Sequence, residues 1–342
     1  MGSSKPEERS CHVMSALFCG LDVHKDSTYA TLLDSGGRVV DHHRMSNDSV
    51  LSFLSGYQID RIGMEASNQV APLYRQLTKV GYSVQVSHPR KTRYIAEAKI
   101  KSDRVDSKAI AELVRLDALP SAYMPPRSIA ELREKVRRRA FLVRERTKLR
   151  VKVRSILTYE GTRPPEGFGL FTEKGVGWLH GLSMESVESY LRVLKPLNDE
   201  ILRISKHLKE LAGGDEEVKL LMTIPGVGYY TALLVKAEVG DVGRFGDGDR
   251  LCSYAGLVPS THSSGGVMRH GSITKEGSRW LRWAMVEAAM VHVHRYDTAI
   301  TRAYHRIAER RGKQVATVAA ARKLLSCCYS VMVNRRPYHD QA

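Results

Sequence analysis

Four acidic residues of this chain have the types and positions that could hold a divalent metal ion. Asp103 and Asp106 lie three residues apart at the predicted start of a helix, so both side chains project from one face. Asp22 and Glu65 each end a short apolar run that is typical of a strand. Carboxylate oxygens are the ligands that Mg²⁺ prefers, and bound metals can polarise a phosphate. The alternative is ordinary helix capping, because acids are common in a first helical turn.

A hydroxyl-rich segment near the C-terminus offers a second kind of chemistry. Residues 260–266 read Ser-Thr-His-Ser-Ser-Gly-Gly, and Arg269, His270, Lys275 and Arg279 follow. A serine in this segment could act as a nucleophile among cations that neutralise a phosphoryl group. The alternative is a flexible Ser/Gly loop, and the segment by itself does not decide between the two.

The composition favours a nucleic-acid partner. The chain has 342 residues and a formal net charge of +16, and a protein this basic most often binds a polyanion. Its hydrophobic fraction of 42% is ordinary for a globular protein, and no apolar run approaches the length of a membrane span. The first 15 residues lack the apolar core of a signal peptide, and the five cysteines lack zinc-binding spacing. We therefore expect a cytoplasmic protein with no membrane partner.

The hydrophobic pattern predicts an α/β domain at residues 17–126, after a disordered N-terminal extension at residues 1–16. Strands are predicted at residues 17–22, 29–33, 39–44, 61–65 and 83–87, and helices at 49–55, 70–80, 92–98 and 103–116. A three-stranded meander followed by alternating helices and strands is typical of an RNase H-like sheet. In that arrangement Asp22 ends the first strand, Glu65 ends the fourth, and the helix of Asp103 and Asp106 packs beside them.

A basic helical region is predicted at residues 127–214. The helix at 128–159 carries many cations and few acids, which suits a phosphate backbone, although a solvated helix face is the alternative. The contacts that we expect come from Arg137, Arg138, Arg139, Arg146 and Lys148. A Gly/Pro-rich linker follows at 161–177. Apolar residues from Tyr190 to Leu211 then recur with heptad spacing, which predicts a coiled coil within one chain or between subunits, with Pro196 delaying the start of its helix.

The remaining residues, 215–342, form a predicted helical domain that contains the serine segment. Residues 220–234 resemble a helix-hairpin-helix, in which Gly226 and Gly228 would expose backbone N–H groups to a phosphate. The alternative is a simple helix–turn–helix in the core. Two more helices are predicted at 278–295 and 314–334. We expect His292, His294 and His305 to lie on helix surfaces without a metal-binding role.

Five motifs in order complete a pattern that resembles a known family. They are Gly20–Lys25, Met64–Ser67, Lys101–Lys108, Ile224–Gly228 and Ala255–Pro259. In this order they resemble the DEDD insertion-sequence transposases, also called the IS110 family, and the resemblance runs from about residue 17 to residue 334. It implies an RNase H-like (RuvC-like) N-terminal domain, a helical coiled-coil middle and a mostly helical C-terminal transposase domain.

The resemblance also assigns residues and partners. It implies that Asp22, Glu65, Asp103 and Asp106 bind Mg²⁺, and that Ser264 is the nucleophile, with Ser263 as the neighbouring alternative. It further implies donor and target DNA, an element-encoded bridge RNA that guides recombination, and a homo-oligomer, either a dimer or a tetramer. The protein would act in a bacterial or archaeal cell, at the nucleoid. Arg269 and Lys275 would contact the nucleic-acid backbone.

Two other hypotheses fit the same residues. A metal-dependent nuclease or Holliday-junction resolvase would use the four acids with water as the nucleophile, and Ser264 would then be structural. A non-catalytic nucleic-acid-binding protein would carry these acids as capping and surface groups. Substitution of the acids and of Ser264 separates the three hypotheses.

Overall fold

The computed structural model describes residues 16–67, 69–88, 103–264 and 267–340, with only the backbone described at 103–105, 261–264 and 267–270. The chain divides into two compact units, residues 1–124 and 125–342. The predicted disordered extension, up to residue 15, and the predicted helix at 92–98 lie outside the described residues.

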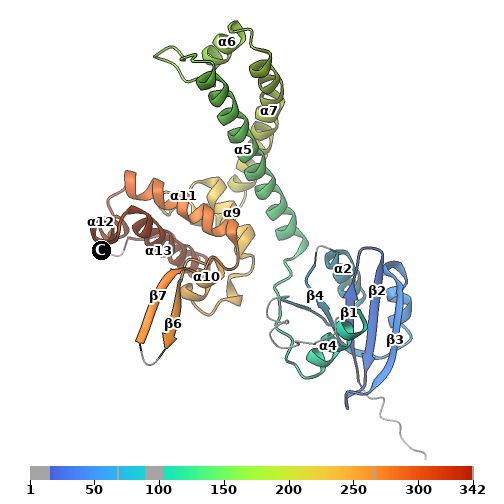
Figure 1. Ribbon diagram of the computed structural model, residues 1–342. Coiled ribbons are helices and arrows are strands. Elements are labelled where there is room, and N and C mark those ends of the chain that lie inside the picture. Colours follow the sequence, from blue (N-terminus) through green and yellow to red (C-terminus); the bar gives the residue numbers. More distant parts are fainter. Residues whose placement is uncertain (1–15, 68, 89–102, 265–266, 341–342) are drawn as a thin grey trace, which may run out of the picture. The chain divides into compact units, whose positions relative to one another are not determined.

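The first unit contains one five-stranded mixed sheet with the strand order β3-β2-β1-β4-β5 (Figure 1). β1, β2 and β3 are antiparallel neighbours, whereas β4 runs parallel to β1 and β5 runs parallel to β4. The predicted meander and the alternation after it are confirmed. The elements are β1 (Leu17–Val23), β2 (Ser27–Leu33), β3 (Val39–Ser46), η1 (Asn47–Ser49), α1 (Val50–Leu54), β4 (Ile59–Glu65), α2 (Val70–Val80), β5 (Val84–Ser87) and α4 (Asp103–Arg115).

The two faces of this sheet have different apolar partners. On one face Leu21, Met64 and other strand residues pack with Leu73 and Leu77 of α2 in a buried cluster. On the other face Phe18 of β1 packs with a second cluster that includes Ile110 of α4. Successive strand residues point to opposite faces, so the alternation along β1 decides which residues meet α4.

Glycines bring α4 into close contact with the centre of the sheet. A Cβ atom at Gly20 of β1 would collide with the backbone of Ser107 and Ala111 in α4. At Gly63 of β4, a Cβ atom would overlap the side chains of Val114 and Ile110. Any larger residue at these two positions would push the helix away from the strands.

The second unit is helical except for one two-stranded sheet. Its elements are α5 (Arg127–Tyr159), α6 (Glu173–Gly181), α7 (Glu185–Gly213), α8 (Glu216–Leu221), α9 (Tyr229–Val239), η2 (Val242–Arg244), α10 (Gly248–Tyr254), β6 (Pro259–Ser264), β7 (Val267–Ile273), α11 (Arg279–Arg295), α12 (Ala299–Arg311) and α13 (Lys313–Asn334).

The long helices α5 and α7 lie side by side, and α6 connects them at their far end (Figure 1). Val153 and Leu157 of α5 share a buried cluster with Leu191 and Leu194 of α7, so the apolar stripe of α7 packs within one chain. Two details of the prediction were wrong. Helix α7 begins at Glu185 and continues through Pro196, and α6 begins at residue 173, inside the predicted linker. Packing of the long apolar face holds α7 together despite the missing N–H of its proline.

The C-terminal part corrects two further expectations. The structure contains an additional helix, α12, whose first turn is capped by the Thr298 side chain accepting a hydrogen bond from the Thr301 N–H. The hydroxyl-rich segment that could be read as a flexible loop is instead strand β6 of a hairpin with β7. Among the described helices, α13 alone has the length and apolarity of a membrane span, and much of it is buried in the core of this unit.

Candidate active site and nucleic-acid interface

Asp22 and Glu65 lie on the same face of the sheet as Gly20 and Gly63, the face that packs against α4. This follows because side chains two residues apart in a strand point to the same side. Asp22 follows Gly20 by two residues in β1, and Glu65 follows Gly63 by two residues in β4. β1 and β4 are parallel and in register, with Gly20 opposite Gly63. The two carboxylates therefore end neighbouring strands at the same edge and on the same face.

Helix α4 points its first turn toward that edge. Its last turn is held at the opposite edge, where the Arg115 side chain donates a hydrogen bond to the Ser35 carbonyl in the turn after β2. Midway, the Ser107 and Thr31 hydroxyls are joined by a buried hydrogen bond of 2.7 Å. The helix thus runs antiparallel to β1. Asp103 and Asp106 in its first turn are carried toward the end of the sheet that bears Asp22 and Glu65.

The donor chemistry of this edge suits a hard divalent cation. Asp22 retains 17% side-chain exposure, and its Oδ2 lies 3.2 Å from Nε2 of His24. Among the side chains that the structure describes, no group of three or more His, Cys, Asp or Glu residues is arranged to hold a metal ion. The side chain of Asp103 is not among them, so the described geometry covers three of the four predicted acids.

The predicted nucleophile ends strand β6. Ser264 pairs with Val267, and Ser263 pairs with Met268, which makes Ser264 the last paired residue of its strand. Arg269 pairs with His262 across the hairpin. The described backbone therefore places Ser264 at the end of the paired strand and Ser263 one residue before it.

The base of the hairpin is fixed to α10 and α11. The Ser278 N–H donates to the Tyr254 carbonyl at 2.9 Å, and Arg282 donates to the Ala255 carbonyl at 2.8 Å. A Cβ atom at Gly277 would collide with the Tyr254 carbonyl. Lys275 lies in this turn with a positive φ of 55° and an exposed side chain. The hairpin thus rises from a rigid base.

The Pro225–Gly228 turn connects α8 to α9 and packs against α11. Gly226 has a φ of +86°, and a Cβ atom there would lie 2.8 Å from the Ala288 carbonyl oxygen. His292 is fully buried beneath the turn, with Nδ1 at 2.7 Å from the Pro225 carbonyl and Nε2 at 2.7 Å from the Thr298 hydroxyl. The expectation that His292 lies on a helix surface was wrong, since its polar atoms join two turns. Gly228 at the N-terminus of α9 has open surroundings.

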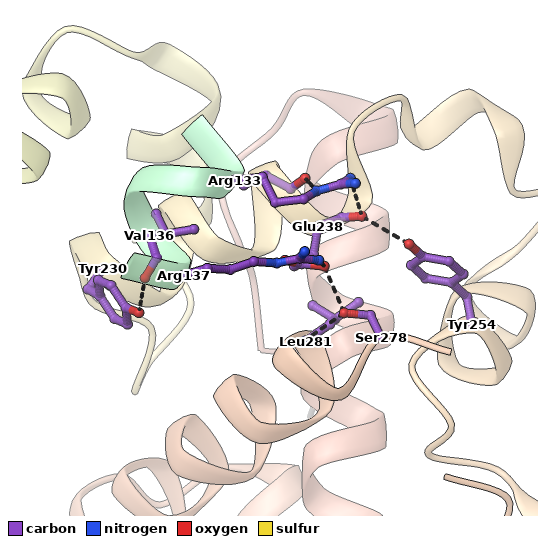
Figure 2. A network of polar contacts seen from close by, with 9 residues as sticks. Arg133, Val136, Arg137, Tyr230, Glu238, Tyr254, Ser278 and Leu281 are labelled. Carbon is purple, nitrogen blue, oxygen red and sulfur yellow. Dashed lines mark hydrogen bonds and ion pairs between the residues drawn. The ribbon is translucent and has the colours of Figure 1, made fainter. Parts of the chain in front are cut away.

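Three arginines of the inner half of α5, residues 127–143, form hydrogen bonds to other helices of the second unit: Arg133, Arg137 and Arg139. Figure 2 shows Arg137 against Glu238 of α9, with Nε–Oε1 and Nη2–Oε2 distances of 2.7 and 2.8 Å. Ser278 donates to the same carboxylate, and Arg133 donates to the Ala237 and Glu238 carbonyls. A buried carboxylate with this many donors is a structural junction between three helices.

Two neighbouring arginines of the inner half differ in their contacts. Arg139 donates to the Ser205 hydroxyl of α7 at 2.7 Å and lies 4.3 Å from the centre of the Tyr230 ring. Arg138 is exposed and lies 3.5 Å from Glu134, one turn earlier in the same helix. Among the three predicted contacts in this half, Arg138 is the one whose described ion pair stays within α5.

The outer half of α5, residues 144–159, presents its cations differently. Lys148 pairs with Glu145 at 2.8 Å, and this exposed pair is weak. Arg146 makes no ion pair within the described residues, and its Nε is buried without a hydrogen-bond partner. The predicted nucleic-acid contacts therefore separate into residues committed to the fold and residues whose charge is available.

Sequence reasoning missed Glu238. It is fully buried, yet it stands in the apolar run of α9 as its single acid. A lone carboxylate in such a run must find a cationic partner when it is buried. That signal was present, and the opposing cation is one that we had assigned to nucleic acid.

Comparisons with known proteins agree with this architecture. Residues 19–160 match a family model of IS110 DEDD transposases, and residues 218–306 match the model described as the transposase IS116/IS110/IS902 family. The chain is 27% identical to the transposase for insertion sequence element IS1111A of Coxiella burnetii, over 93% of this chain and 90% of that protein. It is also 27% identical to a probable family 20 transposase of Pseudomonas aeruginosa, over 89% of this chain and 93% of that protein.

A third relative is named for a different rearrangement of DNA. The pilin gene-inverting protein of Moraxella bovis is 32% identical over 41% of this chain and 46% of that protein. A mixed α/β sheet that carries acids at one edge, followed by a basic helical unit, is compatible with a DEDD transposase. The chain belongs to the IS110 family of transposases, and it is a DNA transposase.

Proposed function

We propose that this transposase cuts and rejoins DNA through attack of Ser264 on the scissile phosphate, assisted by the acids at the edge of the sheet. The observation that carries the proposal is the common position of Asp22, Glu65 and the start of α4 on one face and one edge. The strand order β3-β2-β1-β4-β5, in which β2 alone runs opposite to the other four strands, supports an RNase H-like fold for this unit.

The acids fit Mg²⁺ by their chemistry. Asp22, Glu65, Asp103 and Asp106 would hold it, since hard cations select carboxylate oxygens and Asp22 remains accessible. When bound, the metal supplies positive charge that neutralises the charge developing on the phosphate. The close contact of α4 with Gly20 fixes the distance between the helix and the strands that bear these acids.

The chemistry at Ser264 balances without an external energy source. Its Oγ forms a bond to phosphorus and gives up its proton, while a deoxyribose oxygen leaves phosphorus and takes up a proton. Attack by a deoxyribose hydroxyl on the phosphoserine then reverses these changes and joins the new strands. The position of Ser264 as the last paired residue of β6, on a rigid base, supports this role.

The partners would be donor and target DNA and a non-coding bridge RNA encoded by the element. The net charge of +16 supports binding of this much polyanion. A homo-oligomer, a dimer or a tetramer, would bring the acids of one subunit to the serine of another, in the cytoplasm at the nucleoid. Sequence choice would then come from RNA–DNA pairing.

The test is a denaturing gel of the full chain incubated with Mg²⁺, the RNA flanking the element and end-labelled donor and target DNA. We expect a labelled band that remains with the protein and disappears in both Asp22→Ala and Ser264→Ala. The matched control is Ser263→Ala, which removes the hydroxyl of the preceding strand residue and should leave the band. Loss of the band in Ser263→Ala but not in Ser264→Ala would move the nucleophile by one residue. Cut DNA without any protein-linked band would indicate the nuclease that uses water.

A further inference from the structure

Three arginines in the outer half of α5 form a row on one side of the helix. Arg146, Arg150 and Arg154 recur every four residues, so their Cα atoms rise about 6 Å per step along the helix axis. We call them the outer arginine row. Residues 144–154 contain one acid, Glu145, and it is paired with Lys148. Within the described residues, no member of the row makes an ion pair.

The row is held in place by an aromatic ring. The guanidinium carbon of Arg150 lies 4.9 Å from the centre of the Phe171 ring, and that of Arg154 lies 5.5 Å away. Phe171 packs against the buried cluster that contains Val153 and Leu157, so the ring is a fixed platform. Cation–π contacts of this kind stabilise the arginines without neutralising their charge.

Two donors of the row have no acceptor. The Nε atoms of Arg146 and Arg150 are buried and form no hydrogen bond. Burial lowers the pKa of Arg150, and the charges of Arg146 and Arg154 lower it further. The free protein thus keeps three like charges together and leaves two N–H groups unsatisfied, which costs free energy. An anion that binds the outer nitrogens of these guanidinium groups would relieve the repulsion between the three charges.

We propose that the outer arginine row, on its Phe171 platform, binds successive phosphates of one nucleic-acid strand. This inference deepens the proposed function and rests on it for the identity of the partner. A phosphodiester strand is favoured over an acidic peptide because it offers regularly spaced anions to a regularly spaced row, and guanidinium planes can also stack on bases. The strand comes from RNA or from DNA.

The test is the salt dependence of binding by the full chain. The triple variant Arg146→Gln, Arg150→Gln, Arg154→Gln is compared with a control triple, Arg127→Gln, Arg192→Gln, Arg203→Gln. The control removes the same charge from exposed arginines that are each paired with an acid, Glu131, Glu185 or Glu200. Fluorescence anisotropy is measured with labelled 24-nucleotide single-stranded RNA, single-stranded DNA and duplex DNA at several salt concentrations.

We expect the row variant to lose affinity at least about tenfold and to lower the slope of log K against log salt by about 2 on a single strand, at about 0.7 per phosphate contact. The control triple should keep the wild-type slope. The nucleic acid that shows the largest loss identifies the source of the strand. Equal slopes for the row variant and the wild type on all three probes would overturn the proposal. A fourth probe, a labelled glutamate-rich peptide, tests the alternative partner. A loss of affinity in the row variant that is confined to this peptide would also overturn the proposal.

Two additions keep the test decisive. If the triple variant does not fold, as judged by circular dichroism, the single variant Arg154→Gln at an exposed position should still lower the slope by about 0.7. A wild-type protein that forms no DNA adduct, while the row variant still loses its slope, would refute the proposed serine chemistry and retain the row.

Discussion

The two halves of α5 carry similar charge in different surroundings, and this difference separates arginines that hold the fold from arginines that are free to bind. In the inner half, Arg133, Arg137 and Arg139 donate to carbonyl, carboxylate and hydroxyl oxygens of the same unit. In the outer half, the Nε atoms of Arg146 and Arg150 are buried and form no hydrogen bond. A continuous basic helix can therefore serve two purposes along its length.

The comparison also shows why a count of cations overstates a binding surface. Arg137 contributes to the net charge, but its charge is matched by the fully buried Glu238. A matched charge has little attraction left for a phosphate, whereas an unmatched one retains it. The location of acids on other helices thus decides which arginines of α5 can bind nucleic acid.

The largest effect on stability is expected from Arg137→Ala, which removes the ion pair between α5 and Glu238 of α9. The substitution leaves the Glu238 carboxylate buried without its charged partner, and the free energy of unfolding should fall by about 3–5 kcal/mol. Urea unfolding followed by circular dichroism measures the change. The matched control is Arg138→Ala, whose exposed pair with Glu134 should contribute no more than about 0.5 kcal/mol. Equal losses in the two variants would show that the Glu238 junction does not stabilise the unit.

A smaller effect on stability is expected from Tyr230→Phe, which tests a second contact of the inner half of α5. The Tyr230 hydroxyl donates to the Val136 carbonyl of α5 at 2.8 Å, and its loss should cost about 1 kcal/mol. Burial raises the pKa of Tyr230 from 10.0 to about 12, although Arg139 opposes the rise. The folded state therefore resists ionisation, and its stability is present below pH 10 and is lost as the pH rises toward 12.

The measurement is the free energy of unfolding at pH 9 and pH 11. The wild type should lose more stability over this interval than Tyr230→Phe, which has no hydroxyl to ionise at this position. The matched control is Tyr159→Phe, at an exposed tyrosine of the outer half, which should behave as the wild type. An identical pH dependence in Tyr230→Phe and the wild type would contradict the assignment.

The fold of the first unit could be predicted because its signals are local. Apolar alternation located the strands, and the same alternation placed Asp22 and Glu65 two residues after the glycines on which α4 packs. The placement of Asp22 and Glu65 at the ends of their strands could therefore be predicted from local patterns, whereas their role as metal ligands stays a prediction. The distances from these acids to Asp103 and Asp106 depend on how closely α4 packs on the sheet. That packing requires a residue without a side chain at Gly20, and a sequence pattern alone does not reveal this contact.

The second unit was less predictable because its decisive contacts join distant residues. Arg137 and Glu238 are about a hundred positions apart, and so the basic helix alone could not reveal which cations are matched. His292 was predicted to lie on a helix surface, whereas it is buried and its two hydrogen bonds come from separate turns. The hairpin was read as a loop because serine and glycine give strands no apolar alternation.

The smallest effect is expected from Arg150→Gln, and its sign distinguishes the two halves of α5. Burial and the charges of Arg146 and Arg154 lower the pKa of Arg150, so its protonated form is less favourable in the folded state than in the unfolded state. Because Arg150 stays protonated at neutral pH, its charge costs stability there, and this cost would be removed only above its folded pKa. Arg150→Gln should thus change the free energy of unfolding by no more than about 0.5 kcal/mol, toward greater stability. Added salt should stabilise the wild type more than the variant, because it screens the repulsion within the row. A loss above about 1 kcal/mol would mean that the outer half, like the inner half, is committed to the fold.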